Sequence, residues 1–86
     1  MLIIRTQKRE TLCKVDYVTL RKNPNGYEVH STNNVLGYYS SKEKALKVLD
    51  MIEEAALQKD YFTVGNGYPI IKEQLFQMPQ DNEVSV

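Results

Sequence analysis

The hydrophobic pattern is most regular over residues 36–59, where it predicts an amphipathic helix. At about 100° per residue, one side of this helix gathers only apolar residues, namely Ala45, Val48, Leu49, Ile52, Ala55 and Ala56. The opposite side is polar, with Glu43, Lys47, Asp50, Glu54 and Gln58. Ser40 and Glu43 have the spacing of a capping box, so we expect the helix to begin at Ser41. Because the apolar stripe is rich in alanine, a sheet can approach it closely.

Shorter apolar runs before the helix predict four β-strands, at residues 1–6, 12–21, 27–30 and 35–39. Within the second run the apolar phase changes between Tyr17 and Val18, which we attribute to a β-bulge near Asp16. Residues 23–26, Asn-Pro-Asn-Gly, are typical of a tight turn between antiparallel strands.

The chain after the helix has a weaker pattern. Residues 60–64 are interpreted as a short strand or a packed loop, and residues 65–69 as a turn. Residues 74–78 suit a fifth, edge strand that is ended by Pro79. The polar, acidic residues 80–86 are expected to form a mobile tail.

This order of elements predicts an α+β fold, with an antiparallel meander sheet of about four to five strands and one amphipathic helix packed on one face. We expect one domain over residues 1–79 and a short acidic tail over residues 80–86. A chain of 86 residues has a small core, so a partner copy would add to its stability.

The charge balance removes one class of function. The chain has 11 basic and 11 acidic residues, which gives no bulk electrostatic reason for binding nucleic acid or an anionic membrane. The first 30 residues nevertheless carry six basic against three acidic residues, so a local anion-binding face stays open beside an ordinary solvated surface.

Cys13 is the only cysteine, so the chain has no internal disulfide and no thiolate metal cluster. No signal-peptide core and no apolar run of membrane-spanning length is present. We therefore expect a soluble, intracellular protein of a reducing cytoplasm.

Candidates for catalysis are few. His30 is the single histidine, and no nucleophile motif accompanies it, so we interpret it as a surface or sheet-edge residue. Asp50, Glu53 and Glu54 have the spacing of a solvated helix face and lack histidine or cysteine partners for a metal. Residues 65–70 begin like a dinucleotide fingerprint, but Ile70 replaces its third glycine. We predict no catalytic residue, no metal, no cofactor and no enzymatic activity.

The tyrosines are the remaining candidates for a binding site, since their flat rings pack at interfaces and stack on bases. Tyr38 and Tyr39 point to opposite sides of their expected strand, so one packs beneath the helix and the other lies outward. If Arg5 or Arg21 neighbours the outward ring, the pair offers a stacking surface and a phosphate fork. The alternative is that each is an ordinary tyrosine half-buried on a sheet. The candidate ligand-binding residues are Arg5, Arg21, Tyr38, Tyr39 and Tyr68.

Three segments resemble small uncharacterised proteins of phages, prophages and integrative elements of Gram-positive bacteria. They are residues 36–52 (LGYYSSKEKALKVLDMI), residues 76–81 (FQMPQD) and the opening residues 3–7 (IIRTQ). No activity accompanies this pattern, so the resemblance implies a genetic setting and no catalytic residue. Residues 58–72 look longer than in such proteins, which indicates either an insertion with its own role or a neutral loop.

A phage setting implies counter-defence for a small neutral protein without enzyme chemistry. The first expectation is a homo-oligomer that sequesters a host immune signalling nucleotide in a pocket between subunits. One alternative is a protein-binding inhibitor that caps a host defence or regulatory protein. A second alternative is a nucleic-acid-binding regulator, which the acidic exposed side of the helix disfavours.

Overall fold

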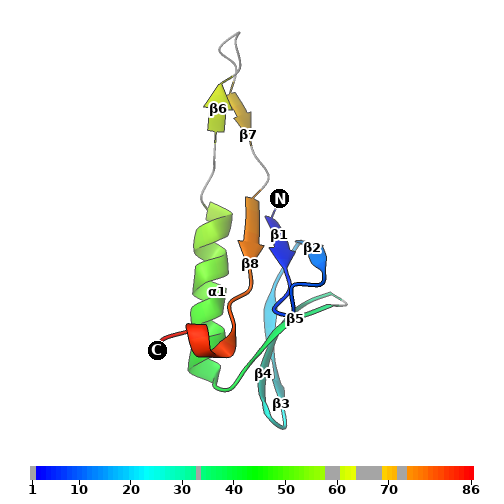
Figure 1. The fold of residues 1–86 in the computed structure, drawn as a ribbon, viewed down its shortest axis with the longest axis vertical. Coiled ribbons are helices and arrows are strands. Elements are labelled where there is room, and N and C mark those ends of the chain that lie inside the picture. The colour runs from blue at the N-terminus through cyan, green and yellow to red at the C-terminus, as the bar shows by residue number, and fades with distance from the viewer. Residues whose placement is uncertain (1, 33, 58–60, 64–68, 72–73) are drawn as a thin grey trace.

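The computed structural model describes residues 2–32, 34–57, 61–63, 69–71 and 74–86. The α+β class expected from the sequence is confirmed (Figure 1). In chain order the elements are β1 (Leu2–Arg5), β2 (Leu12–Val15), β3 (Thr19–Asn23), β4 (Gly26–Ser31), β5 (Asn34–Tyr39), α1 (Lys42–Leu57), β6 (Tyr61–Thr63), β7 (Pro69–Ile71), β8 (Gln74–Gln77) and the 3-10 helix η1 (Asp81–Glu83). None of the helices in the described ranges has the length and apolar character needed to cross a membrane.

The strands form two three-stranded sheets and a two-stranded ribbon, so the expectation of a single meander sheet is wrong. Strands β3, β4 and β5 do form an antiparallel meander. The other sheet has β1 at its centre, with β2 antiparallel on one side and β8 parallel on the other. The strand expected at residues 74–78 exists as β8, at an edge. It returns beside β1 because the chain crosses over through α1 before reaching it, which a parallel pair requires.

The expected second strand is two strands that belong to different sheets. β2 ends at Val15 and β3 begins at Thr19, and residues 16–18 carry the chain from one sheet to the other. The change of apolar phase at residue 17 therefore marks a strand break, and the β-bulge expected near Asp16 is wrong. Each half keeps its own alternation, since Cys13 in β2 is buried and Leu20 in β3 packs against the core.

The helix starts one residue later than expected, and a different serine caps it. The Lys44 backbone N–H donates to the Ser41 hydroxyl at 3.2 Å, so Ser41 is the capping residue and Lys42 is the first helical residue. Ser40 is occupied elsewhere, because its backbone N–H and hydroxyl both donate to the Asp81 carboxylate. The capping box between Ser40 and Glu43 is therefore not formed.

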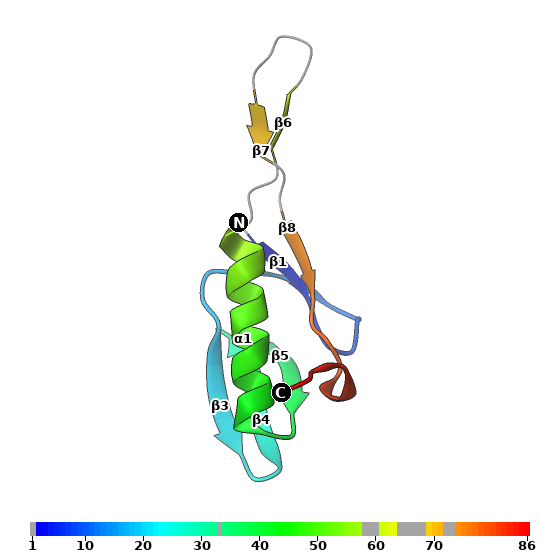
Figure 2. The ribbon, with the colours of Figure 1, turned by 90° about the vertical axis from the view of Figure 1, so that its left-hand side faces the viewer.

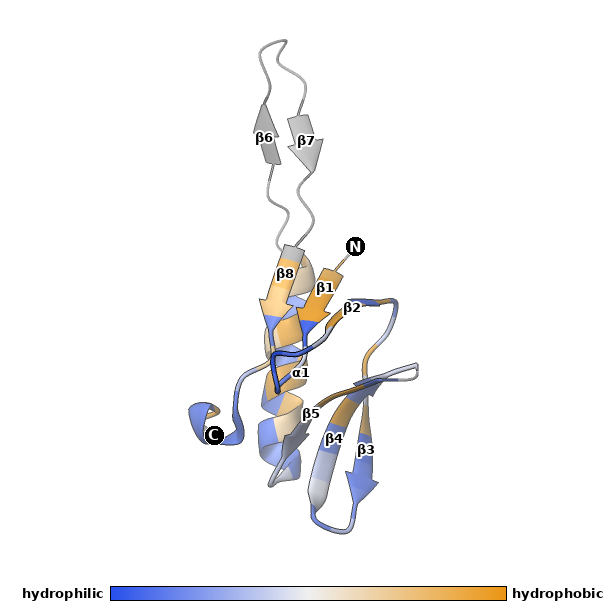
Figure 3. Cartoon of the chain, turned by 45° about the vertical axis from the view of Figure 1, so that its right-hand side comes forward, coloured by the Kyte–Doolittle hydropathy of each residue, from blue (hydrophilic) through white to orange (hydrophobic). Residues whose placement is uncertain are grey.

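The core lies where α1 meets strands from both large sheets (Figures 1 and 2). Ala45, Val48 and Ile52 of α1 are buried as the periodicity predicts, whereas Ala56 is exposed. The strands contribute buried apolar residues, which are Leu2, Ile4, Cys13, Val29, Leu36 and Tyr39. Figure 3 shows the apolar composition of β1 and β8 and the apolar stripe of α1.

The C-terminal segment belongs to this core, so the expectation of a mobile tail over residues 80–86 is wrong. Met78 and Val84 are 1% and 6% exposed, and η1 lies between them in sequence. The Gln80 backbone N–H and the Glu83 carboxylate are hydrogen-bonded at 2.8 Å, which closes a local cap around this turn. One buried valine and a hydrogen-bonded turn are enough to order a segment whose composition is polar.

The Asn-Pro-Asn-Gly turn joins β3 to β4 as predicted. The Asn25 backbone N–H donates to the Asn23 side-chain oxygen at 2.9 Å, and Gly26 has a φ of 151°. A Cβ atom at Gly26 would lie 2.5 Å from the Tyr39 carbonyl oxygen, so only glycine fits there.

Strands β6 and β7 pair only with each other among the described strands. The short strand that the sequence allowed at residues 60–64 is β6 (Tyr61–Thr63). Most of the turn expected at residues 65–69 lies outside the described residues. Figures 1 and 2 draw this ribbon apart from α1 and both larger sheets.

Candidate functional site

The face of the meander sheet opposite the core carries the clearest set of polar and aromatic side chains. Directly paired residues of an antiparallel sheet lie on the same face, so the register puts Arg21, Glu28 and Tyr38 in one row across β3, β4 and β5. Thr19, His30 and Val35 form the next row. We call these two rows the outer face of the meander sheet.

Tyr38 and Tyr39 lie on opposite sides of β5, as their alternation predicts. The Tyr38 residue is 51% exposed on the outer face, whereas Tyr39 is 2% exposed in the core. The Tyr39 hydroxyl donates to the Pro79 carbonyl oxygen at 2.7 Å. Burial raises the pKa of Tyr39 well above its usual range, and the negative charges of Asp81 and Glu83 add to the rise. The hydroxyl therefore stays protonated and remains a donor.

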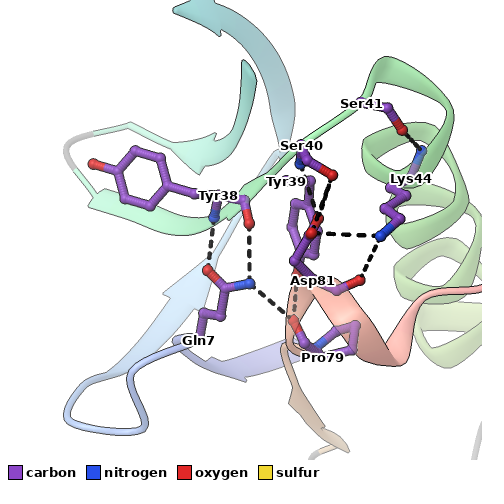
Figure 4. A network of polar contacts seen from close by, with 8 residues as sticks. All are labelled: Gln7, Tyr38, Tyr39, Ser40, Ser41, Lys44, Pro79 and Asp81. Carbon is purple, nitrogen blue, oxygen red and sulfur yellow. Dashed lines mark hydrogen bonds and ion pairs between the residues drawn. The ribbon is translucent and has the colours of Figure 1, made fainter. Parts of the chain in front are cut away.

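The Gln7 side chain holds the backbone of Tyr38 on both sides (Figure 4). Its amide oxygen accepts from the Tyr38 N–H at 2.8 Å, and its amide nitrogen donates to the Tyr38 carbonyl at 3.1 Å. The same nitrogen is 3.2 Å from the Pro79 carbonyl oxygen. Gln7 thus pairs with β5 as a neighbouring strand would, and it fixes the strand that carries the exposed tyrosine ring.

Asp81 ties the start of α1 to the C-terminal segment in the same network (Figure 4). Its carboxylate accepts from the Ser40 backbone N–H at 2.8 Å and from the Ser40 hydroxyl. The Lys44 ammonium donates to the Asp81 carbonyl at 3.0 Å and lies 3.4 Å from the carboxylate. The backbone hydrogen bond from Ser40 holds the pKa of Asp81 below its usual range, with help from the Ser40 hydroxyl and the Lys44 charge.

Two hollows in the surface border Tyr38. The first has a volume of about 200 Å³ and lies between the β1–β2 turn and β5. The residues that line it are Thr6, Gln7, Lys8, Glu10, Thr11, Asn34, Val35, Leu36, Gly37 and Tyr38. The second has a volume of about 280 Å³ and lies beside the β3–β4 turn, with Asn23, Asn25, Gly26, Tyr27, Tyr38, Tyr39 and Ser40 around it. We call the first one the Lys8 hollow, because Lys8 is its only basic residue.

The structure brings two of the five predicted ligand-binding residues onto one face. Arg21 and Tyr38 share a row of the outer face, but Glu28 stands between them on β4. Two strand spacings separate them, about 10 Å between their backbones. The Glu28 carboxylate accepts from the Asn23 side chain at 3.2 Å, and its charge opposes a phosphate held at that point.

The other three predicted residues do not join this face. Arg5 is exposed on β1, which belongs to the other sheet. Tyr39 is buried and its hydroxyl is already bonded, so its ring supports β5 and offers no face to a ligand in the single chain. Tyr68 lies outside the described residues.

Sequence reasoning missed Gln7 and Lys8. Both lie in the polar run after β1, whose composition predicts only a turn. The hydrogen bonds of Gln7 reach residues 31 and 72 positions away, so no local spacing could reveal them. His30, expected at the surface or at a sheet edge, is partly exposed on the central strand β4.

Within the described parts of the chain, no group of three or more His, Cys, Asp or Glu residues is placed to hold a metal ion. Comparison of the sequence with models of protein families and with curated proteins finds no match, and no solved structure resembles it.

Proposed function

We propose that this is a non-enzymatic binding protein that sequesters a host immune signalling nucleotide as a homo-oligomer in the bacterial cytoplasm. In this proposal it serves a phage or a mobile element against host defence, the setting that its sequence resemblance implies. Helix α1 covers the inner face of the meander sheet and leaves the outer face for the ligand.

The half-exposed Tyr38 beside the Lys8 hollow carries the proposal. Stacking of one base on an aromatic side chain contributes about 1–3 kcal/mol without requiring a particular base. The Lys8 ammonium supplies a positive point charge for a phosphate, and Thr11 and Asn34 add polar groups to the same hollow. Gln7 fixes the backbone of Tyr38, so little ordering is needed when a ligand binds.

A single subunit does not complete such a site, which supports an oligomer. The Lys8 hollow has about 200 Å³, whereas pockets for drug-sized ligands span about 300–1,000 Å³. Glu10 lines the same hollow and offsets the charge of Lys8. A second copy would enlarge the hollow and bring further basic side chains, of which Arg5 and Arg21 are exposed.

The second candidate function is a protein-binding inhibitor, and the composition of the outer face favours it. Tyrosine and arginine are enriched at protein interfaces, and Tyr38, Val35 and Arg21 are exposed on this face. A face of this kind can bury Tyr38 as a central anchor against a host protein.

Thermal unfolding in the presence of cyclic dinucleotides, cyclic trinucleotides and cyclic ADP-ribose isomers distinguishes the two functions. A bound nucleotide raises the midpoint by mass action, by about 2.7 kcal/mol of stability at 100 times its Kd. Tyr38→Ala and Lys8→Ala should each weaken binding at least about tenfold in calorimetry, which is the loss of about 1.4 kcal/mol.

Matched controls are Tyr17→Ala, an equally exposed tyrosine that lines neither hollow, and Lys47→Ala on the exposed side of α1. Both should bind as the wild type does. No shift with any nucleotide would overturn the first proposal, and capture of a host protein that Tyr38→Ala no longer captures would then establish the second. Light scattering that finds only monomer at binding concentrations would contradict the oligomer.

A further inference from the structure

Two exposed leucines lie on the solvent side of α1. Leu46 and Leu57 are 44% and 73% exposed, and Asp50 and Glu53, which lie between them in sequence, are exposed as well. The four positions are three or four residues apart, so they form one stripe along the helix. This stripe lies on the side of α1 away from its buried residues. We call these four residues the outer stripe of α1.

The sheet β2-β1-β8 carries apolar side chains on its face away from the core. Its buried face holds Leu2, Ile4 and Cys13, so the alternate positions point outward. Leu12 and Leu75 among these positions are 56% and 62% exposed. We call the outward positions the outer face of the β1 sheet. The register arranges them in two rows, which are Leu12, Arg5 and Gln77, and Lys14, Ile3 and Leu75.

The two surfaces carry opposite charges. Arg5 and Lys14 are exposed on the outer face of the β1 sheet, and none of its six positions is acidic. Asp50 and Glu53 are exposed on the outer stripe of α1, and none of its four positions is basic. Each surface thus combines leucines with charges of one sign. Complementary charges select the partner of such a surface, because a surface of like charge is repelled.

The dimensions of the two surfaces match. The outer stripe is about 16 Å long from Leu46 to Leu57, at about 1.5 Å per residue. Three strands about 4.8 Å apart form a face about 10 Å wide, which is the width of one helix. A helix on a sheet is also the arrangement of the chain's own core, where α1 packs against β4, β5 and β8. One helix therefore covers the outer face of the β1 sheet.

The two surfaces lie on opposite sides of the molecule. Figure 2 shows α1 in front of the sheets, whereas Figure 3 shows β1 and β8 in front of α1. The outer stripe therefore cannot reach the β1 sheet of its own chain, and the match is between two copies. Because each copy has one surface of each kind, the contact is heterologous and repeats from copy to copy in a ring or an open chain of subunits.

We propose that the outer stripe of α1 in one copy packs on the outer face of the β1 sheet of the next copy, head to tail. Asp50 and Glu53 then face Arg5 and Lys14, and the leucines of each surface pack on the other. This rests on the homo-oligomer of the proposed function and names the surfaces that form it. The contact does not involve the outer face of the meander sheet.

Charge reversal on each surface tests the contact, with light scattering over a range of concentrations as the measurement. Arg5→Glu with Lys14→Glu makes the sheet face acidic, and Asp50→Lys with Glu53→Lys makes the helix stripe basic. Each pair alone should raise the dissociation constant at least about tenfold, because both surfaces then carry the same sign. An equimolar mixture of the two variants should associate again, and so should a chain that carries all four changes.

The matched control is Arg9→Glu with Lys22→Glu, which changes the net charge equally at exposed positions outside both surfaces. It should associate as the wild type does. Leu12→Ser and Leu46→Ser test the apolar part, and each should weaken association at least about tenfold, whereas the exposed Tyr17→Ser should leave it unchanged. Circular dichroism checks the fold of each variant, and the serine variants decide the test if a charge-reversed pair is unfolded.

A wild type that stays monomeric at every concentration overturns the contact, and so does a mixture of the two charge-reversed pairs that fails to associate. The contact is also overturned if a monomeric wild type captures an acidic host protein that Arg5→Glu with Lys14→Glu no longer captures, because the face then belongs to that partner.

Nucleotide binding is measured separately on the wild type. A wild type that binds no nucleotide, while the mixed variants associate, overturns only the proposed ligand. A wild type that binds a nucleotide, while the mixed variants stay apart, overturns only the head-to-tail contact.

Discussion

Replacement of Gln7 by alanine is expected to destabilise the protein, although Gln7 lies in a turn. The Gln7 amide makes three hydrogen bonds, two with the Tyr38 backbone and one with the Pro79 carbonyl. A neutral hydrogen bond contributes about 0.5–1.5 kcal/mol net, so the three together contribute about 1.5–4.5 kcal/mol. In Gln7→Ala, water can replace part of this contribution by bonding to the Tyr38 N–H and carbonyl. The Pro79 carbonyl still accepts a hydrogen bond from the Tyr39 hydroxyl.

We therefore expect Gln7→Ala to lower the free energy of unfolding by about 1–3 kcal/mol. For a domain of this size that is a large share of the total, which is of order 4–13 kcal/mol at the usual stability per residue. The measurement is chemical denaturation followed by circular dichroism. The control is Lys8→Ala next to it, an exposed side chain whose loss should change the free energy by no more than about 0.5 kcal/mol.

A double-mutant cycle isolates the shared carbonyl. Tyr39→Phe removes the second donor to Pro79 and leaves the ring in the core. Combined with Gln7→Ala it leaves the Pro79 oxygen with neither donor, so the pair should differ from the sum of the single changes by at least about 0.5 kcal/mol. If Gln7→Ala stays within about 0.5 kcal/mol of the wild type, or if the cycle is additive, the interpretation of Gln7 as a link between β5 and the C-terminal segment is refuted.

Two further predictions concern the C-terminal segment. The pKa of Asp81 is lowered in the folded protein, so its contribution to stability is present above the ordinary aspartate pKa of about 3.9 and is lost as the pH falls through the lower folded value. The stability advantage of the wild type over Asp81→Asn should therefore be constant above about pH 5 and shrink as the pH falls below it. An advantage that is independent of pH would contradict the carboxylate's role. Val84 is 6% exposed, whereas Val86 is 70% exposed. In the same denaturation assay, Val84→Ala should lower the free energy of unfolding by about 1–3 kcal/mol, and Val86→Ala should leave it nearly unchanged. Equal effects of the two variants would mean that the segment is not packed.

Local patterns predicted the elements whose signals repeat within a few residues. The apolar stripe of α1 places Ala45, Val48 and Ile52 in the core, because helical periodicity and burial have a common geometric cause. The opposite orientations of Tyr38 and Tyr39 follow from strand alternation in the same way. The turn at residues 23–26 was predictable because its residue types match the required backbone angles.

Long-range arrangement was not predictable from those patterns. A change of apolar phase at residue 17 fits a bulge and a strand break equally well, and only the partner strands decide between them. The parallel pairing of β8 with β1 joins segments about 70 residues apart and leaves no mark on the spacing of either strand. Val84 was missed because one apolar residue in a polar segment has no period, although its burial orders the segment.

The candidate site was predicted in part for the same reason. Alternation identified Tyr38 as the outward ring, but the position of Arg21 relative to it depended on the register of three strands. The register places Glu28 between Arg21 and Tyr38, and no local pattern in the sequence predicts this.

Hydrogen bonds link the proposed site to the C-terminal segment, although the C-terminal segment lines neither hollow. The Gln80 side chain donates to the Gln7 carbonyl at 2.6 Å, and Gln7 in turn holds the backbone of Tyr38. Asp81 fixes Ser40 immediately after β5, so the strand carrying Tyr38 is held from the turn on one side and from the start of α1 on the other. A small domain buries a smaller share of its surface than a large one. The polar contacts of the last residues add to the support of β5, because they join the edge of the meander sheet to the turn after β1.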